Sequence, residues 1–281
     1  MMQKIVLEIY NALCYLISCN KEKFENLSMI EKILKIEFKK INRQQKDCFH
    51  IDELTYFLNH ISCYDSKINE KLTNIFIKKE PVKKIIDIKN ISTVSASKSK
   101  SSGLSYESLY IFGAEQIRKK SEYKSWSFER LVEYVLKRHG NVLDLYYYAW
   151  LDKYEWSNHD ASHRLGLAIY RAYENNIDCN VEASIHHIEL NKEKIEVLLN
   201  TYELFIINKN TIYKITDIIG RKNYFTCELR DENKIIGFEK DKFKHDSIIR
   251  VLKKIDERYI LNFNEYIRNL LDNQRKFQKK H

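Results

Sequence analysis

The feature that most constrains the fold is an aromatic segment that leads straight into a helical pattern. Residues 143–156 are rich in Tyr, Trp and Leu, which favour strands, and Asp152-Lys153 interrupts them as a tight turn would. Ser162 suits the start of a helix. Small and aliphatic residues then recur at helical spacing: Leu165, Ala168, Ile169 and Ala172. The pattern predicts two paired strands and a helix that begins within about two residues of Ser162.

Residues 158–164, Asn-His-Asp-Ala-Ser-His-Arg, form the junction between the second strand and the helix. A helix start presents unpaired N–H groups and the positive end of the helix dipole, so it attracts phosphate. An arginine in the first turn opposes the dipole unless an anion sits there. We therefore expect Asp160, Ser162, His163 and Arg164 to form a phosphate- or nucleotide-binding site, in which Asp160 holds the loop or a bound cation.

Each of these residues also has a purely structural interpretation. Arg164 can pair with a carboxylate such as Asp160 or Glu182, and His163 can cover an apolar helix face. Asp160 or Ser162 can be a simple helix cap.

Three neighbouring residues indicate packing as readily as binding. Trp150 and Trp156 fit a core or a strand pair better than a platform on which a base stacks. Gly166, inside the predicted helix, costs about 1 kcal/mol relative to alanine, which indicates either close packing or a ligand above it.

Composition sets the broad class of the protein. A chain of 281 residues suits one large or two modest domains with a substantial core. No apolar run reaches membrane-spanning length, and no signal peptide is recognisable. The six cysteines lack a CxxC pair, which is typical of reduced thiols rather than of a disulfide framework. We expect a bacterial-type cytoplasmic protein.

The formal net charge of +9 raises the question of a nucleic-acid partner. The lysine excess is spread along a chain that is rich in Lys, Ile, Asn and Tyr, as in proteins from AT-rich genomes. Local basic clusters lie within residues 78–84 and 275–280. A solvated helix face or tail explains these clusters, and a nucleic-acid surface is the alternative.

Changes in pattern divide the chain into a helical module at residues 1–80, a core at 82–190, and a mixed strand and helix module at 191–281. The Ser/Lys-rich stretch at 92–103 should be a mobile loop, either a linker or a flap over an anionic ligand. The other expected elements are a strand at 82–88, helices at 105–120 and 127–139, a strand at 177–185, antiparallel strands within 203–240 (the run 212–215 included) and helix at 245–276.

The order strand, two helices, strand, turn, strand, motif helix and strand resembles the ParB/sulfiredoxin-like superfamily over residues 82–190. The motif of that superfamily, often Asp-Gly-x-His-Arg, opens a helix that holds nucleotide phosphates. The matching positions here are Asp160, Ser162, His163 and Arg164. Ala161 replaces the usual glycine, and alanine is a poor substitute if the position needs a positive φ or a close approach of phosphate.

The resemblance implies nucleotide-dependent switching, as in DNA partition proteins, or phosphoryl transfer, as in small-molecule kinases. It does not extend to the reductase chemistry of sulfiredoxins, because Ser162 stands where those enzymes have a cysteine. Phosphoryl transfer needs a carboxylate base. Asp87, near the end of the first core strand, and Glu107, after the Ser/Lys-rich loop, are the candidates.

A metal-dependent alternative uses the same part of the chain. His159-Asp160 with the upstream His139 is similar to the motif of HD-type phosphohydrolases, which need a helical scaffold and a further aspartate. Asp178 is an unconvincing choice for that ligand.

His186-His187 offers imidazoles for a metal site with His159 or His163. Successive strand residues point to opposite faces, however, so one imidazole of the pair should turn away from such a site. We expect no metal site.

The sequence thus predicts an α/β (α+β) protein with a ParB/sulfiredoxin-like core between a helical and a mixed module. The leading function is binding of a nucleotide of the ATP or CTP class, with or without Mg²⁺, as a switch in a nucleic-acid-associated system or for phosphoryl transfer. The alternative is a non-enzymatic basic adaptor or nucleic-acid-binding protein. The expected partners are a nucleotide or other phosphate ligand, with nucleic acid or a protein as options and no membrane.

Overall fold

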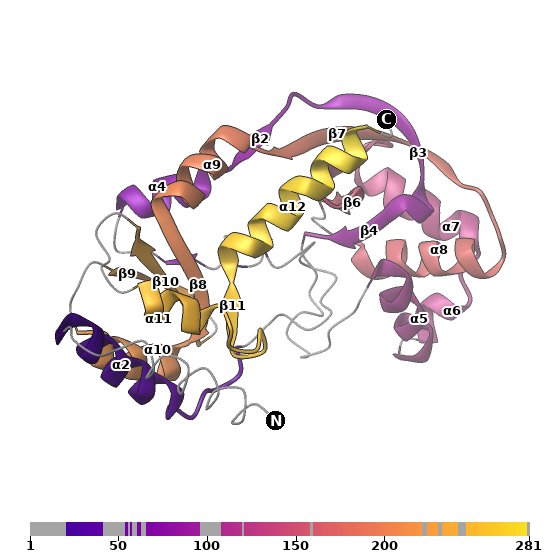
Figure 1. The fold of residues 1–281 in the computed structure, drawn as a ribbon. Helices are drawn as coiled ribbons and strands as arrows, with labels where there is room; N and C mark the ends of the chain where they lie inside the picture. Colours follow the sequence, from indigo (N-terminus) through magenta and orange to yellow (C-terminus); the bar gives the residue numbers. More distant parts are fainter. Residues whose placement is uncertain are drawn as a thin grey trace. The chain divides into compact units, whose positions relative to one another are not determined.

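The computed structural model describes residues 21–41, 54–55, 57, 61–62, 66–95, 108–119, 121–157, 160–220, 224–229, 232–240 and 246–279. These residues form two compact units of mixed α/β structure, each with its own sheet (Figure 1). Unit 1 takes its described residues from 1–42, 60–69 and 196–266, and unit 2 takes them from 43–59, 70–195 and 267–281. Each unit therefore draws on distant segments, and the division into three sequence modules stays a prediction.

The sheet of unit 2 is mixed, with the strand order β2-β7-β5-β6-β4, and β3 also pairs with β7. Its strands are β2 (Phe76–Lys78), β3 (Val82–Asp87), β4 (Ile91–Val94), β5 (Leu143–Tyr148), β6 (Lys153–Trp156) and β7 (Asn180–Leu190). The β5–β6 pair is antiparallel, as predicted, whereas β7 is parallel to β5 and β4 is parallel to β6. Alternation puts Leu145 and Ile185 on one face and Tyr146 and His186 on the other, so at these positions one face is apolar and the other polar.

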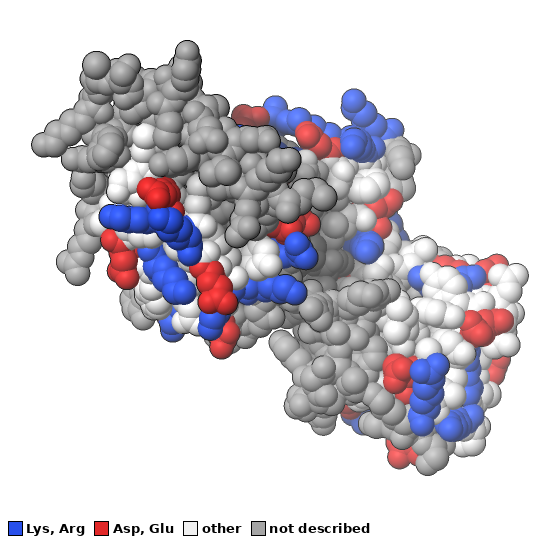
Figure 2. Space-filling view, turned by 60° about the horizontal axis from the view of Figure 1, so that its bottom comes forward, with Lys and Arg blue, Asp and Glu red and all other residues white. Residues whose placement is uncertain are grey.

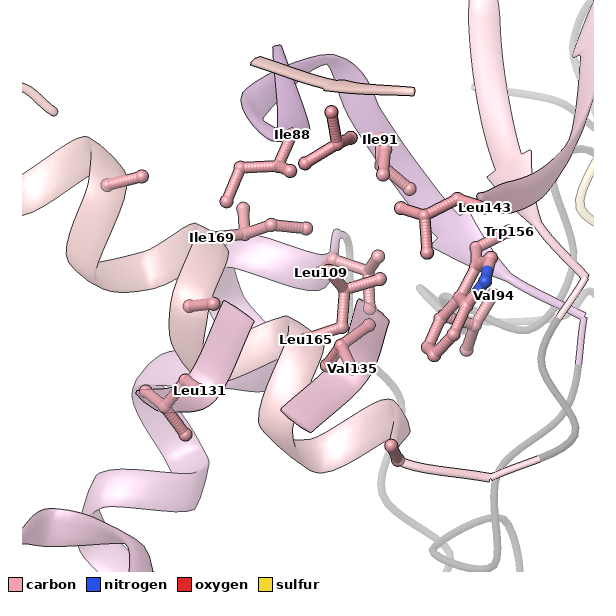
Figure 3. Packing of buried hydrophobic residues seen from close by; sticks show 14 of the residues in the cluster. Ile88, Ile91, Val94, Leu109, Leu131, Val135, Leu143, Trp156, Leu165 and Ile169 are labelled. Atoms are coloured by element: carbon pink, nitrogen blue, oxygen red, sulfur yellow. The ribbon is translucent and has the colours of Figure 1, made fainter. Parts of the chain in front are cut away.

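Helices pack on the apolar face of this sheet. They are α5 (Leu109–Lys119), α6 (Ser121–Lys124), α7 (Phe128–Arg138) and α8 (Ser162–Glu174). The start of α8 at Ser162 confirms the predicted helix, and Ser127 caps α7 by accepting a hydrogen bond from the Arg130 N–H at 3.2 Å. The core joins α8 and α7 to β4, β5 and β6 (Figure 3), where the labelled residues include Leu165, Ile169, Leu131, Val135, Val94, Leu143 and Trp156.

The sheet of unit 1 is antiparallel throughout, with the strand order β1-β9-β10-β8-β11. Its strands are β1 (Ile61–Ser62), β8 (Tyr202–Asn208), β9 (Tyr224–Leu229), β10 (Asn233–Glu239) and β11 (Ile260–Asn262). Every residue of β8, which lies between β10 and β11, is buried. The helix α2 (Lys21–Leu34) packs with α10 (Lys209–Ile219) and α11 (Asp246–Leu252), and Ile30 and Ile33 of α2 join the same core as Phe205 and Phe238.

The remaining elements are α4 (Ser66–Thr73), a 3₁₀ turn (Ile88–Asn90), α9 (Lys192–Thr201) and α12 (Phe263–Gln278). Asn191 caps α9, as predicted, because its side chain accepts a hydrogen bond from the Lys194 N–H at 3.2 Å.

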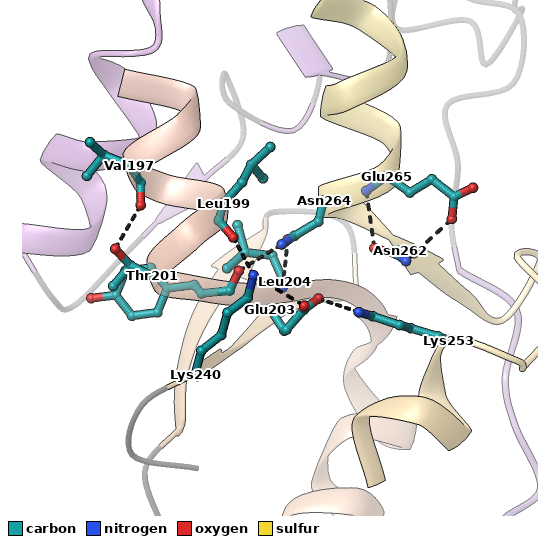
Figure 4. Close-up of polar contacts among 11 residues, drawn as sticks. Val197, Leu199, Thr201, Glu203, Leu204, Lys240, Lys253, Asn262, Asn264 and Glu265 are labelled. Carbon is teal, nitrogen blue, oxygen red and sulfur yellow. Dashed lines mark hydrogen bonds and ion pairs between the residues drawn. The ribbon is translucent and has the colours of Figure 1, made fainter. Parts of the chain in front are cut away.

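Two buried amides of α12 complete the hydrogen bonding of strand ends. Where β11 stops pairing with β8, Asn264 Oδ1 accepts from the Leu204 N–H at 2.9 Å and Asn264 Nδ2 donates to the Tyr202 carbonyl at 2.7 Å (Figure 4). At the end of β7, Gln274 Oε1 accepts from the Leu190 N–H at 2.7 Å and Gln274 Nε2 donates to the Leu190 carbonyl at 3.2 Å. A side-chain amide has both a donor and an acceptor, so each one takes the place of a neighbouring strand.

Figure 4 also shows how unit 1 accommodates a buried carboxylate. Glu203 is only 8% exposed, and its oxygens lie 2.9 Å from Lys253 Nζ and 3.4 Å from Lys240 Nζ. The charge is therefore paired, as burial of an ionised group requires.

The structure corrects the prediction of a mobile loop that covers all of residues 92–103. Residues 91–94 form strand β4, with Ile91, Thr93 and Val94 buried. Their β-branched side chains favour a strand. The neighbouring serines favoured the prediction of a loop instead. Residues 96–103 lie outside the described residues.

Two further corrections concern short apolar runs. Residues 61–62 and 76–78, within the module predicted to be helical, are strands. The run 212–215, predicted to be a strand, lies in α10, where the buried positions recur at three- and four-residue spacing: Thr211, Ile212, Ile215 and Ile219.

Candidate phosphate-binding site

The start of α8 is built around a left-handed residue. Ala161, the cap position, has φ 78° and ψ 14°. Its carbonyl accepts hydrogen bonds from the N–H groups of Arg164 at 2.9 Å and Leu165 at 3.1 Å, which closes the first turn. Alanine in this conformation is strained because of its Cβ atom. The position occupied by glycine in the resembling superfamily therefore does take a positive φ here.

Asp160 organises the loop before the helix rather than capping the helix itself. Its Oδ1 accepts from the Ala161 N–H at 2.8 Å, and Oδ2 lies 3.6 Å from a guanidinium nitrogen of Arg138. The Asp160 carbonyl lies 3.4 Å from His139 Nε2. The end of α7 and the start of α8 thus meet at Asp160, which brings Arg138 and His139 to the motif.

The guanidinium of Arg164 is enclosed by three aromatic rings. Its Cζ lies 4.0 Å from the ring centre of Tyr134, 4.6 Å from that of Tyr123 and 5.3 Å from that of Trp126. Arg164 Nε is buried without a hydrogen-bond partner, and no carboxylate among the described residues pairs with this arginine. Aromatic faces attract a cation but do not neutralise it. Positive charge therefore stays where the helix dipole is positive too.

Arg138 shares one of these rings. Its Cζ lies 5.5 Å from the Tyr134 ring centre, and its Nε and terminal nitrogen donate to the Tyr134 hydroxyl at 3.2 Å and 3.0 Å. Two guanidinium groups, of Arg138 and Arg164, are thus held next to one tyrosine. Sequence reasoning missed Arg138 and the rings, although Arg130, Tyr134 and Arg138 recur at four-residue spacing and so share one helix face.

The other motif residues face the neighbouring helix or the interior. The His163 ring stacks on Phe112 of α5, with centroids 5.3 Å apart, and Ser162 is buried. Close packing against α5 requires glycine at position 166. A Cβ at this position would lie 2.7 Å from Phe112 Cδ1, and a Cβ on Gly113 would lie 1.9 Å from the Gly166 carbonyl oxygen. The two glycines let α5 and α8 approach closely, so close packing rather than a ligand accounts for Gly166.

Asp87, a candidate base, lies at the opposite end of α8. Its carboxylate accepts from the Lys89 N–H at 2.9 Å and lies 3.3 Å from Lys89 Nζ. The Lys89 carbonyl accepts from the hydroxyl of Tyr173, in the last turn of α8. With a rise of about 1.5 Å per residue, Ser162 and Tyr173 are separated by about 16 Å along the helix. Glu107, the other candidate base, and His159 lie outside the described residues.

The geometry does not favour the HD-type alternative. Asp160 precedes α8 instead of lying inside a continuous helix. Asp178 accepts a hydrogen bond from Lys89 Nζ at 2.6 Å, which raises the pKa of Lys89. In the described part of the chain, no three His, Cys, Asp or Glu side chains are grouped as a metal site would need.

His186 and His187 point to opposite faces of β7, as predicted. His187 contacts Tyr147 edge-on, on the helix-covered side, and burial lowers its pKa. His186 stacks on Tyr146 instead, with ring centroids 5.0 Å apart, and its Nε2 lies 2.8 Å from Asp144 Oδ1. Trp150 and Trp156 are completely buried, which places both in the core.

The sequence profile of one protein family, DUF6685, described as a family of unknown function, matches residues 82–280. The chain belongs to this family. The match begins at β3 and includes both the α8 motif and the sheet strands β8 to β11. Curated proteins and solved structures give no match.

Charge is mixed on the one face of the described residues that Figure 2 draws. On the face drawn in Figure 2, Lys and Arg side chains lie among Asp and Glu side chains rather than in one uninterrupted basic field. No helix in the described ranges is long and apolar enough to cross a membrane.

Proposed function

We propose that this protein binds the phosphate groups of a nucleotide at the start of α8. The proposal includes the ParB/sulfiredoxin-like core, in which this helix is the phosphate-binding element. The observation that carries it is Arg164: a guanidinium fixed by three rings, in the first turn of a helix, without a carboxylate partner among the described residues. An arginine stacked in this way keeps in-plane N–H donors, which suit the oxygens of a phosphate.

Arg138 adds to this support. It is already near the loop through Asp160 at 3.6 Å, a distance too long for a strong hydrogen bond. A phosphate at the helix start can therefore compete with Asp160 for Arg138, and two arginines with a helix dipole form a favourable anion site. In this proposal Asp160 positions the loop through the Ala161 N–H.

Nucleotides of the ATP and CTP class, with or without Mg²⁺, are the proposed ligands. The bound nucleotide acts as a switch in a nucleic-acid-associated system or donates a phosphoryl group. Product analysis with saturating nucleotide and Mg²⁺ separates these two roles. Nucleoside diphosphate formed without an equal amount of inorganic phosphate indicates transfer to an acceptor, whereas equal amounts of both products, or no turnover, fit a switch.

Calorimetric titration with ATP, ADP, CTP and GTP tests the binding site. We expect one of them to bind the wild-type chain, and Arg164→Ala to weaken that binding about ten- to a hundredfold, as loss of a charge-assisted contact of about 1.5–3 kcal/mol implies. Arg164→Lys should also weaken it, because lysine lacks the planar fork. The matched control is Arg118→Ala, which removes an exposed arginine that pairs with Glu115 on α5.

Circular dichroism establishes that each variant is folded before titration. If a folded Arg164→Ala variant binds the nucleotide as tightly as the wild type, the phosphate site is elsewhere. If none of the four nucleotides binds the wild-type chain, the proposal is wrong for this ligand class.

A further inference from the structure

One face of the unit 2 sheet, the face of Tyr146 and His186, carries a row of side chains with hydrogen-bonding groups. Thr93 of β4 is opposite Glu155 of β6, Glu155 is opposite Tyr146 of β5, and Tyr146 is opposite His186 of β7. Directly opposed residues share a face, so these four side chains cross four adjacent strands on one side. None of them belongs to the α8 site.

The two ends of this row differ in exposure. Thr93 and Glu155 are 5% and 7% exposed, and Glu155 accepts a hydrogen bond from the Tyr148 hydroxyl at 3.0 Å. At the other end, the His186 side chain is 18% exposed and that of its partner Asp144 is 44% exposed. The His186 end is therefore the more exposed end of the row.

The position of Asp144 selects one tautomer of the His186 ring. The Asp144 carboxylate is an acceptor and lies 2.8 Å from His186 Nε2, so the imidazole hydrogen is placed on Nε2. In the neutral form of the ring, this tautomer has its lone pair at Nδ1. This atom is buried and has no hydrogen-bond partner among the described residues. A buried acceptor without a partner is costly, and a ligand hydroxyl can satisfy it.

The surroundings of His186 set the chemistry of such a ligand. Lys78 Nζ lies 4.8 Å from the centre of the Tyr146 ring, the same ring on which His186 stacks. The site therefore offers an ammonium donor, the imidazole acceptor and the remaining oxygen of Asp144 as a second acceptor. A hydroxyl group both donates and accepts, so neighbouring hydroxyls match this alternation of donor and acceptors.

We propose that Asp144, His186 and Lys78 form a second binding site, which takes a neutral ligand with neighbouring hydroxyls, such as a sugar ring. His186 Nδ1 accepts a hydrogen bond from one ligand hydroxyl, and Asp144 is the positioning residue that holds the ring. The site is independent of the phosphate site at α8. The shared chemistry of a free sugar and of a nucleoside ribose makes both of them candidates.

The test uses D-glucose, D-ribose and adenosine as probes for the full-length chain, with ligand binding followed by NMR chemical-shift changes. We expect at least one probe to bind with a Kd of about 1 mM or tighter. His186→Phe keeps an aromatic ring against Tyr146 but removes the acceptor, so the affinity should fall about tenfold, the effect of one hydrogen bond of about 1.4 kcal/mol. Binding of adenosine without the free sugars would identify a nucleoside, and binding of the sugars would identify a carbohydrate.

Asp144→Asn tests the positioning role. An asparagine amide can donate to Nε2, which moves the imidazole hydrogen to Nδ1 and turns the acceptor into a donor, as removal of an orienting carboxylate does in catalytic triads. We expect the ¹⁵N shifts of His186 to report this exchange and the affinity to fall. Glu182→Gln, a carboxylate on β7 that pairs with Lys83 instead, is the matched control.

The proposal is overturned if none of the three probes binds at about 1 mM or tighter, or if His186→Phe and Asp144→Asn bind as well as the wild type. Nucleotide binding that depends on Arg164 but is unchanged in both of these variants would support the phosphate site at α8 and contradict a nucleoside site at His186.

Discussion

Interior strands of the two sheets differ in which residues they carry on their second face. In unit 1, β8 is buried along its whole length and its sequence, Tyr-Glu-Leu-Phe-Ile-Ile-Asn, is apolar on both faces over residues 204–207. In unit 2, β5 and β7 bury Leu145 and Ile185 on one face but carry Tyr146 and His186 on the other. Strand β8 is thus buried on both faces, whereas β5 and β7 carry polar side chains on one face at these positions.

Positive φ angles are more frequent in unit 2 than in unit 1. Five non-glycine residues among those described have a positive φ, and four of them lie in unit 2: Asn141, Asp152, Ala161 and Asn176. Three of these four are Asn or Asp, which adopt a positive φ readily, so Ala161 is the strained residue among them. Buried polar groups without partners tend to accumulate where a protein binds ligands. Both proposed sites lie in unit 2, and the substitutions below test the difference between the units.

The largest expected effect is in the unit 1 core. Phe205 is fully buried and contacts Phe238, so Phe205→Ala should lower the free energy of unfolding by about 3–5 kcal/mol. Thr93→Val in unit 2 should be nearly neutral or stabilising, because it replaces a buried hydroxyl without a partner by a methyl group. Urea denaturation followed by circular dichroism measures both. A large loss for Thr93→Val would break the contrast between the two sheets.

A smaller gain is expected at the α8 start. Ala161→Gly removes the Cβ clash of a residue with φ 78°, so it should raise the free energy of unfolding by about 1 kcal/mol. The same substitution should leave nucleotide binding intact or improve it, since glycine lets phosphate approach more closely. Ala168→Gly, within the same helix, is the control and should be destabilising. Destabilisation by Ala161→Gly would mean that the turn is not strained.

The smallest expected effect concerns a surface pair in unit 1. The Arg258 guanidinium and then the Arg258 N–H, both hydrogen-bonded to Asp256, lower the pKa of Asp256 from 3.8 to about 2. Because the folded pKa is lower than the unfolded one, the pair stabilises the fold above pH 3.8 and loses this contribution as the pH falls towards 2. Arg258→Gln should raise the Asp256 pKa in a carboxyl NMR titration. The free energy of unfolding near neutral pH should hardly change, because exposed ion pairs contribute little to stability.

Local patterns predicted the path of the chain around the motif. The aromatic alternation of residues 143–156 and the helical spacing after Ser162 depend on nearby residues alone, and the β5–β6 pair and α8 confirm both. The predicted close packing at Gly166 was one of two options, and the structure decides for it through Gly113. Strand β4 was hidden because its three β-branched residues lie next to a serine-rich stretch.

Contacts between distant residues were not predictable from one sequence. Arg138 reaches Asp160 because α7 ends beside the start of α8, and the pattern of α7 itself gives no sign of this contact. The Asp144–His186 pair needs the parallel register of β5 and β7, which α8 separates along the chain. For Ala161, the resemblance supplied only a conditional statement: alanine is a poor substitute for glycine if the position needs a positive φ. The φ of 78° shows that the position does take a positive φ.

The amides of Asn264 and Gln274 have a consequence for biosynthesis. Translation proceeds towards the C-terminus, so β7 and β8 are synthesised before α12. Until α12 is in place, the backbone groups that its amides bind, at Leu190, Leu204 and Tyr202, lack these hydrogen bonds. Open strand edges can pair with other chains. A nascent or truncated chain that lacks α12 is therefore exposed to aggregation, and the arrival of this one helix removes the hazard at both strands.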